Sequence, residues 1–478
     1  MVISMQIGKY RLDEQQMAIV KDDSPYLLVV AGAGSGKTLT ILGKIKYLIE
    51  SGIKESEILC ISFTKAASTS LKEKIKNELN LDIDVYTFHK LALNILDNKY
   101  RIIDTNTLDY IIDEFFNIDI INHKLNKKIK KLNESELINL KKLLSTFIHL
   151  FKCNNYSLEH FNKILKKSNK LYNIHRKKEK HFLILALNIY LKYQTYLKEN
   201  NEIDFDDMLI YATKKVKEKY NKSIKYIIID EYQDTSFIRF DLIRNIIDKT
   251  SSKLLVVGDD FQSIYRFTGC DINLFLNFKK YYKNSKILKI ENTYRNSKEL
   301  IKIAGSFVMK NKSQIYKNLK SNKHLIDPIE VIYYKNKYDF KKLLKSINSN
   351  DLLILGRNNK DIYNYIDDSF KYRNGKFYYE DKSFTYMTVH KSKGLEADDV
   401  VVINMSNNIL GFPSKIKEEK ILKYLTKYDK YPYSEERRLF YVALTRTKNK
   451  VYLYTPINNE SIFIKELKKD YKVKSRII

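Results

Sequence analysis

The chain has 478 residues, a hydrophobic fraction of 44% and a formal net charge of +29 at pH 7. This length is too great for one compact core, so two to four domains are expected, and the apolar content excludes wholesale disorder. The positive charge indicates a polyanionic partner such as nucleic acid. A compositional bias is the competing explanation, because 73 of the 86 basic residues are lysine and only 13 are arginine, as in products of A/T-rich coding sequences. The 57 acidic residues do not balance the lysines, which favours nucleic-acid binding.

The cysteines and the apolar segments bear on the compartment. Cys60, Cys153 and Cys270 lack the spacing of metal ligands and are expected to be buried thiols in a reducing compartment. The N-terminus has no apolar core of signal-peptide length, and the longest apolar stretches fall short of the ~20 residues that a membrane span needs. We therefore expect a soluble, cytoplasmic protein with no membrane partner.

Short β-branched runs that end in polar clusters predict strands at 26–30, 58–63, 226–229, 254–257, 352–355, 400–403 and 451–454. Apolar runs without alternation suit strands that are buried on both faces of a parallel sheet. Helical patterns lie between the runs, for example over Leu39–Glu50, which Gly52 closes. The predicted fold class is α/β with two parallel sheets.

The organisation along the chain follows from composition. Residues 97–200 contain no glycine and no proline, and their lysine, leucine, isoleucine and asparagine fall at helical spacing. We expect a helical insertion there, between two parts of a first sheet domain at 1–96 and 201–290. A second sheet domain is expected over 291–478, with a short Lys- and Asn-rich insertion near 305–345.

A glycine-rich loop follows the first predicted strand and opens a helix. Small residues allow backbone N–H groups to turn inward around phosphate oxygens, and the helix N-terminus adds partial positive charge. Lys37 would reach the β- and γ-phosphates, and the Thr38 hydroxyl a Mg²⁺ ion. The loop predicts an ATP site formed by Ala31, Gly32, Ala33, Gly34, Ser35, Gly36, Lys37 and Thr38.

An acidic pair follows the strand at 226–229. Asp230 can hold Mg²⁺, and Glu231 can orient and deprotonate the attacking water. After the next strand, Gln262 is suited to sensing the γ-phosphate, while Tyr265 and Phe267 offer faces on which unpaired bases stack. Taken alone, such aromatic residues are more often part of a core.

With these three segments in order, the chain resembles a superfamily 1 DNA helicase of the UvrD/Rep/PcrA type, with details that lean toward the helicase IV branch. The resemblance spans residues 12 to about 455. It implies two RecA-like P-loop domains facing each other, ATP and Mg²⁺ in the cleft, and single-stranded DNA, or junctions with single-stranded tails, across the top. It also implies 3′→5′ polarity, which residue chemistry alone does not show.

Other motifs of that family occur in sequence order. The resemblance implies that Gln16 and Tyr294 contact the adenine and that Glu396 binds the ribose. It also implies that Arg295 and Arg446 contact the γ-phosphate. Planar guanidinium groups suit γ-phosphate stabilisation better than lysine does. Likeness to the DNA-contacting motifs predicts a nucleic-acid surface made of Phe63, Thr64, Thr87, His89, Tyr265, Arg266, Phe267, Arg357 and His390.

The chain also departs from the family pattern. Only about 90 residues separate Tyr294 from Thr385, so the large helical insertion of the family's second domain is reduced or missing, which puts autonomous unwinding in doubt. Thr268 stands where many relatives have arginine, Phe267 replaces the commoner tryptophan, and Ala66 replaces a frequent lysine.

Three functions stay open at this point. The first is an ATP-dependent helicase that unwinds duplex DNA. The second is a translocase that moves along single-stranded DNA without separating strands. The third is a helicase-IV-like regulatory ATPase that acts on a protein partner such as RNA polymerase, with the Lys-rich segment 97–200 as its only candidate partner-binding arm.

Overall fold

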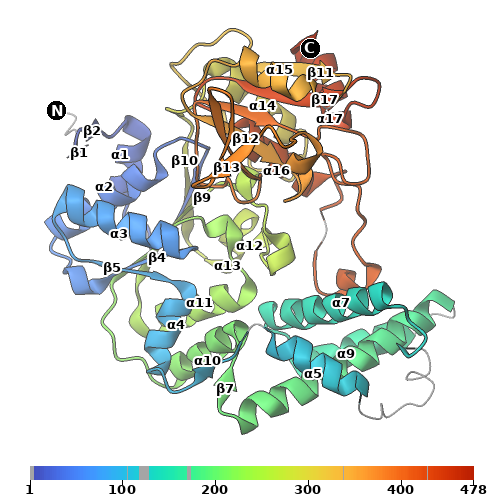
Figure 1. Ribbon diagram of the computed structural model, residues 1–478. Coiled ribbons are helices and arrows are strands. Elements are labelled where there is room, and N and C mark those ends of the chain that lie inside the picture. Colours follow the sequence, from blue (N-terminus) through green and yellow to red (C-terminus); the bar gives the residue numbers. More distant parts are fainter. Residues whose placement is uncertain (1–4, 105, 118–128, 170–173, 337, 428) are drawn as a thin grey trace.

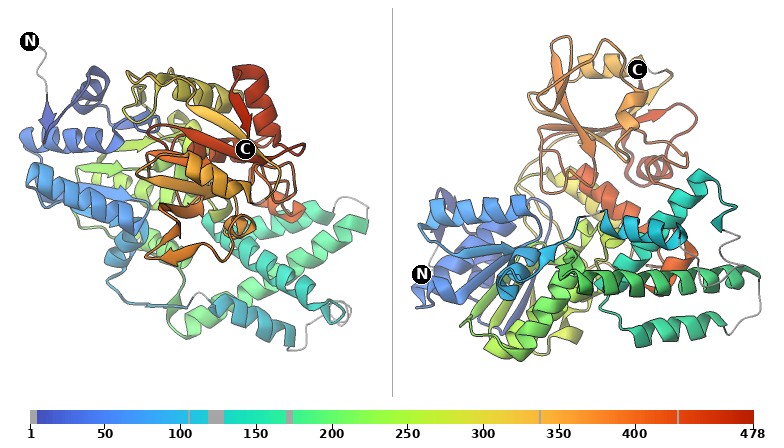
Figure 2. Two further views of the ribbon diagram at one scale, coloured as in Figure 1. Left: turned by 45° about the horizontal axis from the view of Figure 1, so that its top comes forward. Right: turned by 60° about the horizontal axis from the view of Figure 1, so that its bottom comes forward.

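The computed structural model describes residues 5–104, 106–117, 129–169, 174–336, 338–427 and 429–478. Two large sheets lie side by side, and a group of long helices extends from the first (Figures 1 and 2). This arrangement confirms the predicted α/β class with two largely parallel sheets. Among the described residues, no helix is long and apolar enough to cross a membrane.

The first sheet has six parallel strands in the order β10-β3-β9-β8-β4-β5. Their bounds are β3 (Tyr26–Ala31), β4 (Ile58–Ser62), β5 (Asp84–Thr87), β8 (Tyr226–Ile229), β9 (Lys253–Gly258) and β10 (Ser285–Ile290). In β3, Leu27 and Val29 pack with the core on one face of the sheet, and Leu28 and Val30 with the core on the other. Burial on both faces explains the unbroken apolar runs in the sequence.

Helices cover both faces of this sheet (Figure 1). Residues of α2 and α3 join the core on one face, and residues of α4, α10 and α11 the core on the other. The helices around this sheet are α1 (Glu14–Lys21), α2 (Lys37–Glu50), α3 (Lys65–Leu79), α4 (Phe88–Leu96), α10 (Phe205–Glu218), α11 (Phe237–Thr250), α12 (Asn273–Leu276) and α13 (Phe278–Tyr281). A short hairpin of β1 (Gln6–Ile7) and β2 (Tyr10–Arg11) precedes them.

The second sheet has eight strands in the order β13-β14-β15-β12-β16-β17-β11-β18. It is parallel from β15 to β18, and β13 and β14 add an antiparallel edge. The strands are β11 (Ile329–Tyr334), β12 (Leu352–Gly356), β13 (Lys371–Arg373), β14 (Lys376–Tyr379), β15 (Lys382–Thr388), β16 (Asp399–Val402), β17 (Val451–Pro456) and β18 (Lys474–Ile477). The helices beside it are α14 (Lys298–Val308), α15 (Asp339–Ser346), α16 (Ser434–Leu444) and α17 (Ile462–Tyr471).

The stretch 305–345, expected to be a short insertion, contains a strand of the second sheet. Strand β11 lies within it and pairs with both β17 and β18. What separates α14 from β11 is the loop 309–328. The division of the chain into four domain segments remains a prediction.

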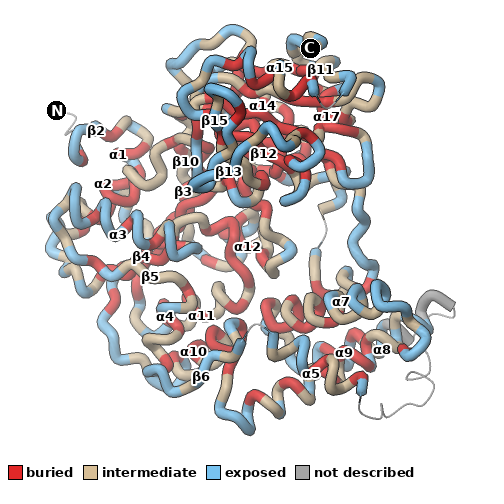
Figure 3. Tube along the Cα trace, viewed as in Figure 1, coloured by how far each residue is buried: buried red, intermediate tan, exposed pale blue. Residues whose placement is uncertain are grey.

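The long helices lie between two short parallel strands, β6 (Arg101–Ile102) and β7 (Glu202–Ile203). They are α5 (Thr107–Asn117), α7 (Glu134–Cys153), α8 (Leu158–Asn169) and α9 (Ile174–Glu199). Buried stretches run along α7 and α9 (Figure 3), and the core of these helices includes Phe147, Phe151 and Leu183. We call this set the helical region.

Ion pairs fix the helical region to the first sheet. Lys152 of α7 is only 2% exposed and lies 2.7 Å from Asp207 and 2.5 Å from Asp204, at the start of α10. One turn earlier, His149 Nδ1 lies 2.7 Å from Asp206 Oδ2. The three carboxylates of the Asp204–Asp207 segment thus hold one face of α7.

A second connection ties the helical region to the second sheet. The strap, residues 413–427 and 429–433, leads from the second sheet to α16 and includes the short helix η6 (Lys420–Tyr424), beside α7 (Figure 1). Ile421 and Leu425 belong to the core of the helical region. Asn154 Nδ2 donates to the Leu425 carbonyl at 3.0 Å, and the Tyr424 hydroxyl to Glu179 Oε2 at 3.1 Å. The two sheets are therefore linked through a third body.

The three cysteines are buried and form no disulfide, as expected. Cys60 lies inside β4, and burial raises the pKa of its thiol to about 12.

Candidate active site and nucleic-acid surface

The phosphate loop joins β3 to α2 at the carboxyl end of the first sheet. Gly34 and Gly36 have φ values of 69° and 79°, a conformation that side chains disfavour. A Cβ on Gly34 would lie 2.5 Å from the Arg295 side chain, so the loop also approaches the segment between β10 and α14 too closely for any other residue. Further contacts come from that side, because the Tyr294 N–H donates to the Gly34 carbonyl at 2.9 Å and the Thr293 hydroxyl to the Ala33 carbonyl at 2.8 Å.

The acidic pair follows the central strand β8. The Lys37 ammonium donates to Glu231 Oε1 at 2.7 Å, and the Glu231 N–H donates to Asp230 Oδ1 at 2.9 Å. Burial, reinforced by the neighbouring Glu231 carboxylate, raises the pKa of Asp230. Although burial opposes it, Lys37 holds the pKa of Glu231 low. Two adjacent half-buried carboxylates are a suitable ligand set for a divalent cation, which removes their mutual repulsion.

Gln262 lies in the short helix η3 (Asp260–Gln262) and is held on both ends of its amide. Its Nε2 donates to Asp259 Oδ2 at 2.7 Å, and its Oε1 accepts from Arg446 Nη2 at 3.2 Å. A carboxylate on one end and a guanidinium on the other define which way the amide points. Gln262 thus connects the first sheet to the second.

The second sheet supplies the arginines. Arg446, just after α16, is 1% exposed and donates to the Val442 carbonyl at 2.9 Å and to the Leu395 carbonyl at 3.1 Å. Arg295 Nε donates to Glu396 Oε2 at 2.7 Å. Burial, together with the nearby Arg295 charge, lowers the pKa of Arg446.

A third group lies at the N-terminus of α1. Gln16 Nε2 donates to the Ser35 carbonyl at 3.2 Å, so its amide contacts the phosphate loop. Asp13 caps α1 and accepts from the Tyr294 hydroxyl at 2.7 Å and from Asn292 Nδ2 at 2.9 Å. Tyr294 is 52% exposed, which leaves much of its ring open for stacking.

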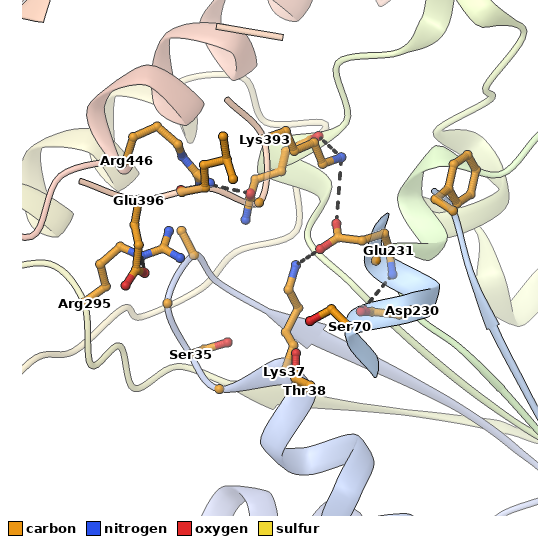
Figure 4. A pocket seen from close by; sticks show the side chains of 18 of the residues that line it. Ser35, Lys37, Thr38, Ser70, Asp230, Glu231, Arg295, Lys393, Glu396 and Arg446 are labelled. Atoms are coloured by element: carbon orange, nitrogen blue, oxygen red, sulfur yellow. Dashed lines mark hydrogen bonds and ion pairs between the residues drawn. The ribbon is translucent and has the colours of Figure 1, made fainter. Parts of the chain in front are cut away.

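These groups face one cavity of about 830 Å³ between the two sheets (Figure 4). In the figure, Lys37 and Glu231 point toward each other, while Arg295 and Arg446 approach from the opposite side. The cavity brings together most of the residues predicted for the nucleotide: Ala33, Gly34, Ser35, Gly36, Lys37, Thr38, Asp230, Glu231, Gln262, Tyr294, Arg295, Glu396 and Arg446. Ala31 and Gly32 lie behind it, at the end of β3, and Gln16 reaches its edge through Ser35.

The structure adds Lys393 and Asp234, which the site prediction omitted. Lys393, on the loop after β15, contacts Asp234, lies 3.8 Å from Glu231 and donates to the Gln262 carbonyl at 2.7 Å. The sequence carries a signal for both, because Lys393 lies three residues before Glu396 and Asp234 three residues after Glu231. Their pairing joins residues 159 positions apart, so neither stretch of sequence alone predicts it.

The residues predicted for DNA are divided between two places. Phe63 and Thr64 line the nucleotide cavity, and Thr64 caps α3 by accepting from the Ala67 N–H. Thr87 caps α4 in the same way. His89 packs edge-on against Phe205, and burial together with Arg239 lowers its pKa to about 4.

Three rings gather where the loop after η3, which carries Tyr265 and Phe267, meets the loop after β15, which carries His390. Phe267 is 56% exposed, and its ring centroid lies 5.7 Å from that of His390 and 6.2 Å from that of Tyr265. The Tyr265 hydroxyl donates to the His390 carbonyl at 2.9 Å, across the two sheets. Burial and the Arg357 charge lower the pKa of His390 to about 4, so the ring is neutral at pH 7. An exposed aromatic surface here is suited to base stacking.

The two arginines of the predicted DNA surface pair with glutamates. Arg266 Nε donates to Glu435 Oε2 at 3.1 Å, and its guanidinium also contacts Glu418 of the strap. Arg357 makes a forked contact with Glu436, at 3.0 and 2.8 Å. Their charges are therefore compensated within the chain.

Comparison with known proteins agrees with this geometry. The model of the UvrD/REP helicase N-terminal domain matches residues 12–283, and that of the UvrD-like helicase C-terminal domain matches residues 358–456. The first match alone covers more than half of the chain.

Similar proteins include the ATP-dependent DNA helicase Rep of Buchnera aphidicola, 31% identical over 70% of this chain and 48% of the relative. PcrA of Bacillus subtilis is 31% identical over 68% of this chain and 43% of the relative. DNA helicase IV of Escherichia coli is 26% identical over 97% of this chain and 71% of the relative. The chain spans about half the length of the Rep and PcrA relatives. With both parts of the family model matched in order, and the two sheets facing one nucleotide-type cavity, the chain belongs to the UvrD/Rep family of superfamily 1 helicases.

Proposed function

We propose that the protein hydrolyses ATP and uses the energy to move along single-stranded DNA in the 3′→5′ direction, separating the strands of a duplex. The observation that carries the proposal is the single cavity that joins the phosphate loop and acidic pair of one sheet to Arg295 and Arg446 of the other. A nucleotide held there contacts both sheets, so binding and hydrolysis change their separation.

Each group has a role in this proposal. The phosphate loop and Lys37 hold the phosphates, with Lys37 leaving its Glu231 partner for the γ-phosphate. Freed of that ammonium, Glu231 orients and deprotonates the attacking water. Thr38 and Asp230 would hold Mg²⁺, which supplies positive charge to the phosphate oxygens when bound.

The opposite wall completes the site. Arg295 and Arg446 stabilise the charge on the γ-phosphate, and Gln262 senses its presence through the Arg446 contact. Tyr294 stacks on the adenine, Gln16 reads its edge, and Glu396 binds the ribose. Because Glu396 holds Arg295 at 2.7 Å, ribose binding and arginine placement are linked.

DNA lies across the top of both sheets in this proposal. The exposed ring of Phe267, with Tyr265 and His390 beneath it, offers the stacking surface. The Tyr265–His390 hydrogen bond crosses between the sheets, so movement of the sheets changes this surface. Arg266 and Arg357 reach phosphates only by exchanging their glutamate partners.

The test is the ATPase rate with and without single-stranded DNA, at two salt concentrations, for the wild type and for Lys37→Ala. We expect strong stimulation by DNA that weakens steeply with salt, and its loss in Lys37→Ala. A variant with full activity would contradict the assignment of the phosphate loop. An ATPase rate indifferent to DNA would instead favour regulation of a protein partner.

Translocation without unwinding is the second candidate, and one observation favours it. Within the described parts of 291–478 the longest helices, α14 and α16, have 11 residues each, so no large helical insertion stands in the second sheet. Strand displacement on a duplex with a 3′ tail distinguishes the candidates. Clear unwinding by the chain alone excludes the second.

A further inference from the structure

A buried lysine lies behind the nucleotide cavity. Lys317 belongs to the loop 309–328, which leads from α14 to β11 of the second sheet but passes against the end of β9 in the first. Its side chain is fully buried, and its ammonium lies 2.5 Å from Asp259 Oδ1 and 2.5 Å from Asp260 Oδ1. The same ammonium is 3.4 Å from the ring centroid of Phe261. A single cation thus serves two consecutive carboxylates.

The two carboxylates need that cation. Both are fully buried, and two adjacent buried negative charges without a counter-charge are strongly unfavourable. Asp260 has further support from the same loop, since it accepts from Gln314 Nε2 at 2.6 Å and from the Ile315 N–H at 2.7 Å. Among the described residues of this loop, only Lys317 donates a hydrogen bond to Asp259.

Asp259 is the residue that orients Gln262. While Oδ1 of Asp259 accepts from Lys317, Oδ2 accepts from Gln262 Nε2 at 2.7 Å. This contact turns the amide oxygen of Gln262 toward Arg446, 3.2 Å away. Lys317 and the Phe261 N–H, the latter at 3.1 Å, both hold Oδ1 of Asp259, which leaves Oδ2 directed at the Gln262 amide.

We propose that Lys317 is a positioning residue for ATP hydrolysis. It holds the Asp259 side chain in place, Asp259 orients Gln262, and Gln262 presents its amide to Arg446 and the γ-phosphate. Lys317 itself lies behind Asp259 and donates to neither Gln262 nor Arg446. The inference rests on the proposed function, and it gives a catalytic purpose to the Lys- and Asn-rich stretch near 305–345.

The central experiment compares Lys317→Met with the wild type in DNA-stimulated ATPase assays. We expect kcat to fall about 100-fold, as for a lost transition-state contact, while KM for ATP changes by less than about 3-fold. The matched control is Lys310→Met, from the same loop. Lys310 also bridges two carboxylates, Glu466 and Asp470, but far from the cavity, so its kcat should stay within about 2-fold of wild type.

A double-mutant cycle separates positioning from general destabilisation. If Lys317 acts through Gln262, adding Lys317→Met to Gln262→Ala lowers kcat by less than about 2-fold further. Independent, multiplicative losses would overturn the inference, and so would a Lys317→Met enzyme with wild-type kcat.

A charge-balanced variant covers the case in which Lys317→Met does not fold. Lys317→Met combined with Asp260→Asn removes one charge of each sign, and we expect it to fold with kcat reduced about 10-fold and an unchanged KM. Wild-type kcat in this variant would overturn the inference. A wild-type protein without DNA-stimulated ATPase would instead refute the proposed function, so the two failures are distinguishable.

Discussion

Replacing Arg446 with lysine tests whether the second sheet acts through guanidinium geometry or through charge alone. The Arg446 side chain donates in three directions, to the carbonyls of Val442 and Leu395 and to the Gln262 amide, over 2.9–3.2 Å. Lysine keeps the charge but has one nitrogen, so it cannot hold the Gln262 and Leu395 contacts together. Two charge-assisted hydrogen bonds at ~1.5–3 kcal/mol each amount to about 3–6 kcal/mol, or ~10²–10⁴ in rate.

We therefore expect Arg446→Lys to lower the DNA-stimulated kcat by about 10³-fold, measured by steady-state ATP hydrolysis at saturating ATP and DNA. The control is Arg437→Lys on α16, the helix that precedes Arg446. Arg437 is 8% exposed and forked to Glu466 at 2.9 and 2.7 Å, away from the cavity. It should lower the melting temperature but leave kcat within about 2-fold. If Arg446→Lys keeps more than about a third of the wild-type kcat, the geometric argument is refuted.

Two further predictions concern other parts of the molecule. Tyr294→Ala removes the exposed ring beside Asp13 and should raise KM for ATP about 10-fold, with a smaller effect on kcat. The control Tyr294→Phe keeps the ring and should stay near the wild-type KM. Equal KM values for the two variants would contradict adenine stacking. The third test measures the melting temperature as a function of pH. Burial opposes the charged form of His149, but Asp206 raises the pKa of His149 above 6.5. The His149–Asp206 pair therefore stabilises the fold fully below pH 6.5, and this stabilisation is lost as the pH rises through the pKa of the folded state. His149→Gln should flatten the melting temperature across that window, and an unchanged pH dependence would show that the pair does not contribute.

Local motifs made the nucleotide half of the site predictable. The strand, the glycine-rich loop and the helix that form the phosphate site are consecutive, so a single stretch, Tyr26–Glu50, specifies their geometry. The parallel sheets followed from unbroken apolar runs for the same local reason. Strands β13 and β14 were missed, because they are only three and four residues long, are mostly exposed and form an edge without an apolar run.

Long-range pairing was not predictable. Arg266 and Arg357 have the residue type of a DNA contact, but their glutamate partners lie 79 to 169 positions away. The burial of Lys317 could not be predicted either, because no sequence pattern distinguishes it from the other lysines among the 73 in the chain. Such contacts depend on how the two sheets meet.

The strap changes how the cleft between the sheets can open. Two domains joined at a single hinge can rotate freely relative to each other. Here the helical region contacts the first sheet at Lys152 and the second through Ile421 and Leu425, so it restrains the relative motion of the two sheets. Burial of these two strap side chains stabilises the contact between the strap and the helical region by about 3–6 kcal/mol, several times the thermal energy. A cycle of cleft motion must therefore slide or tilt the long helices as well. In the proposed cycle we expect the helical region to act as a lever arm, so that α8, which lies away from both sheets (Figure 3), moves farther than the sheets themselves.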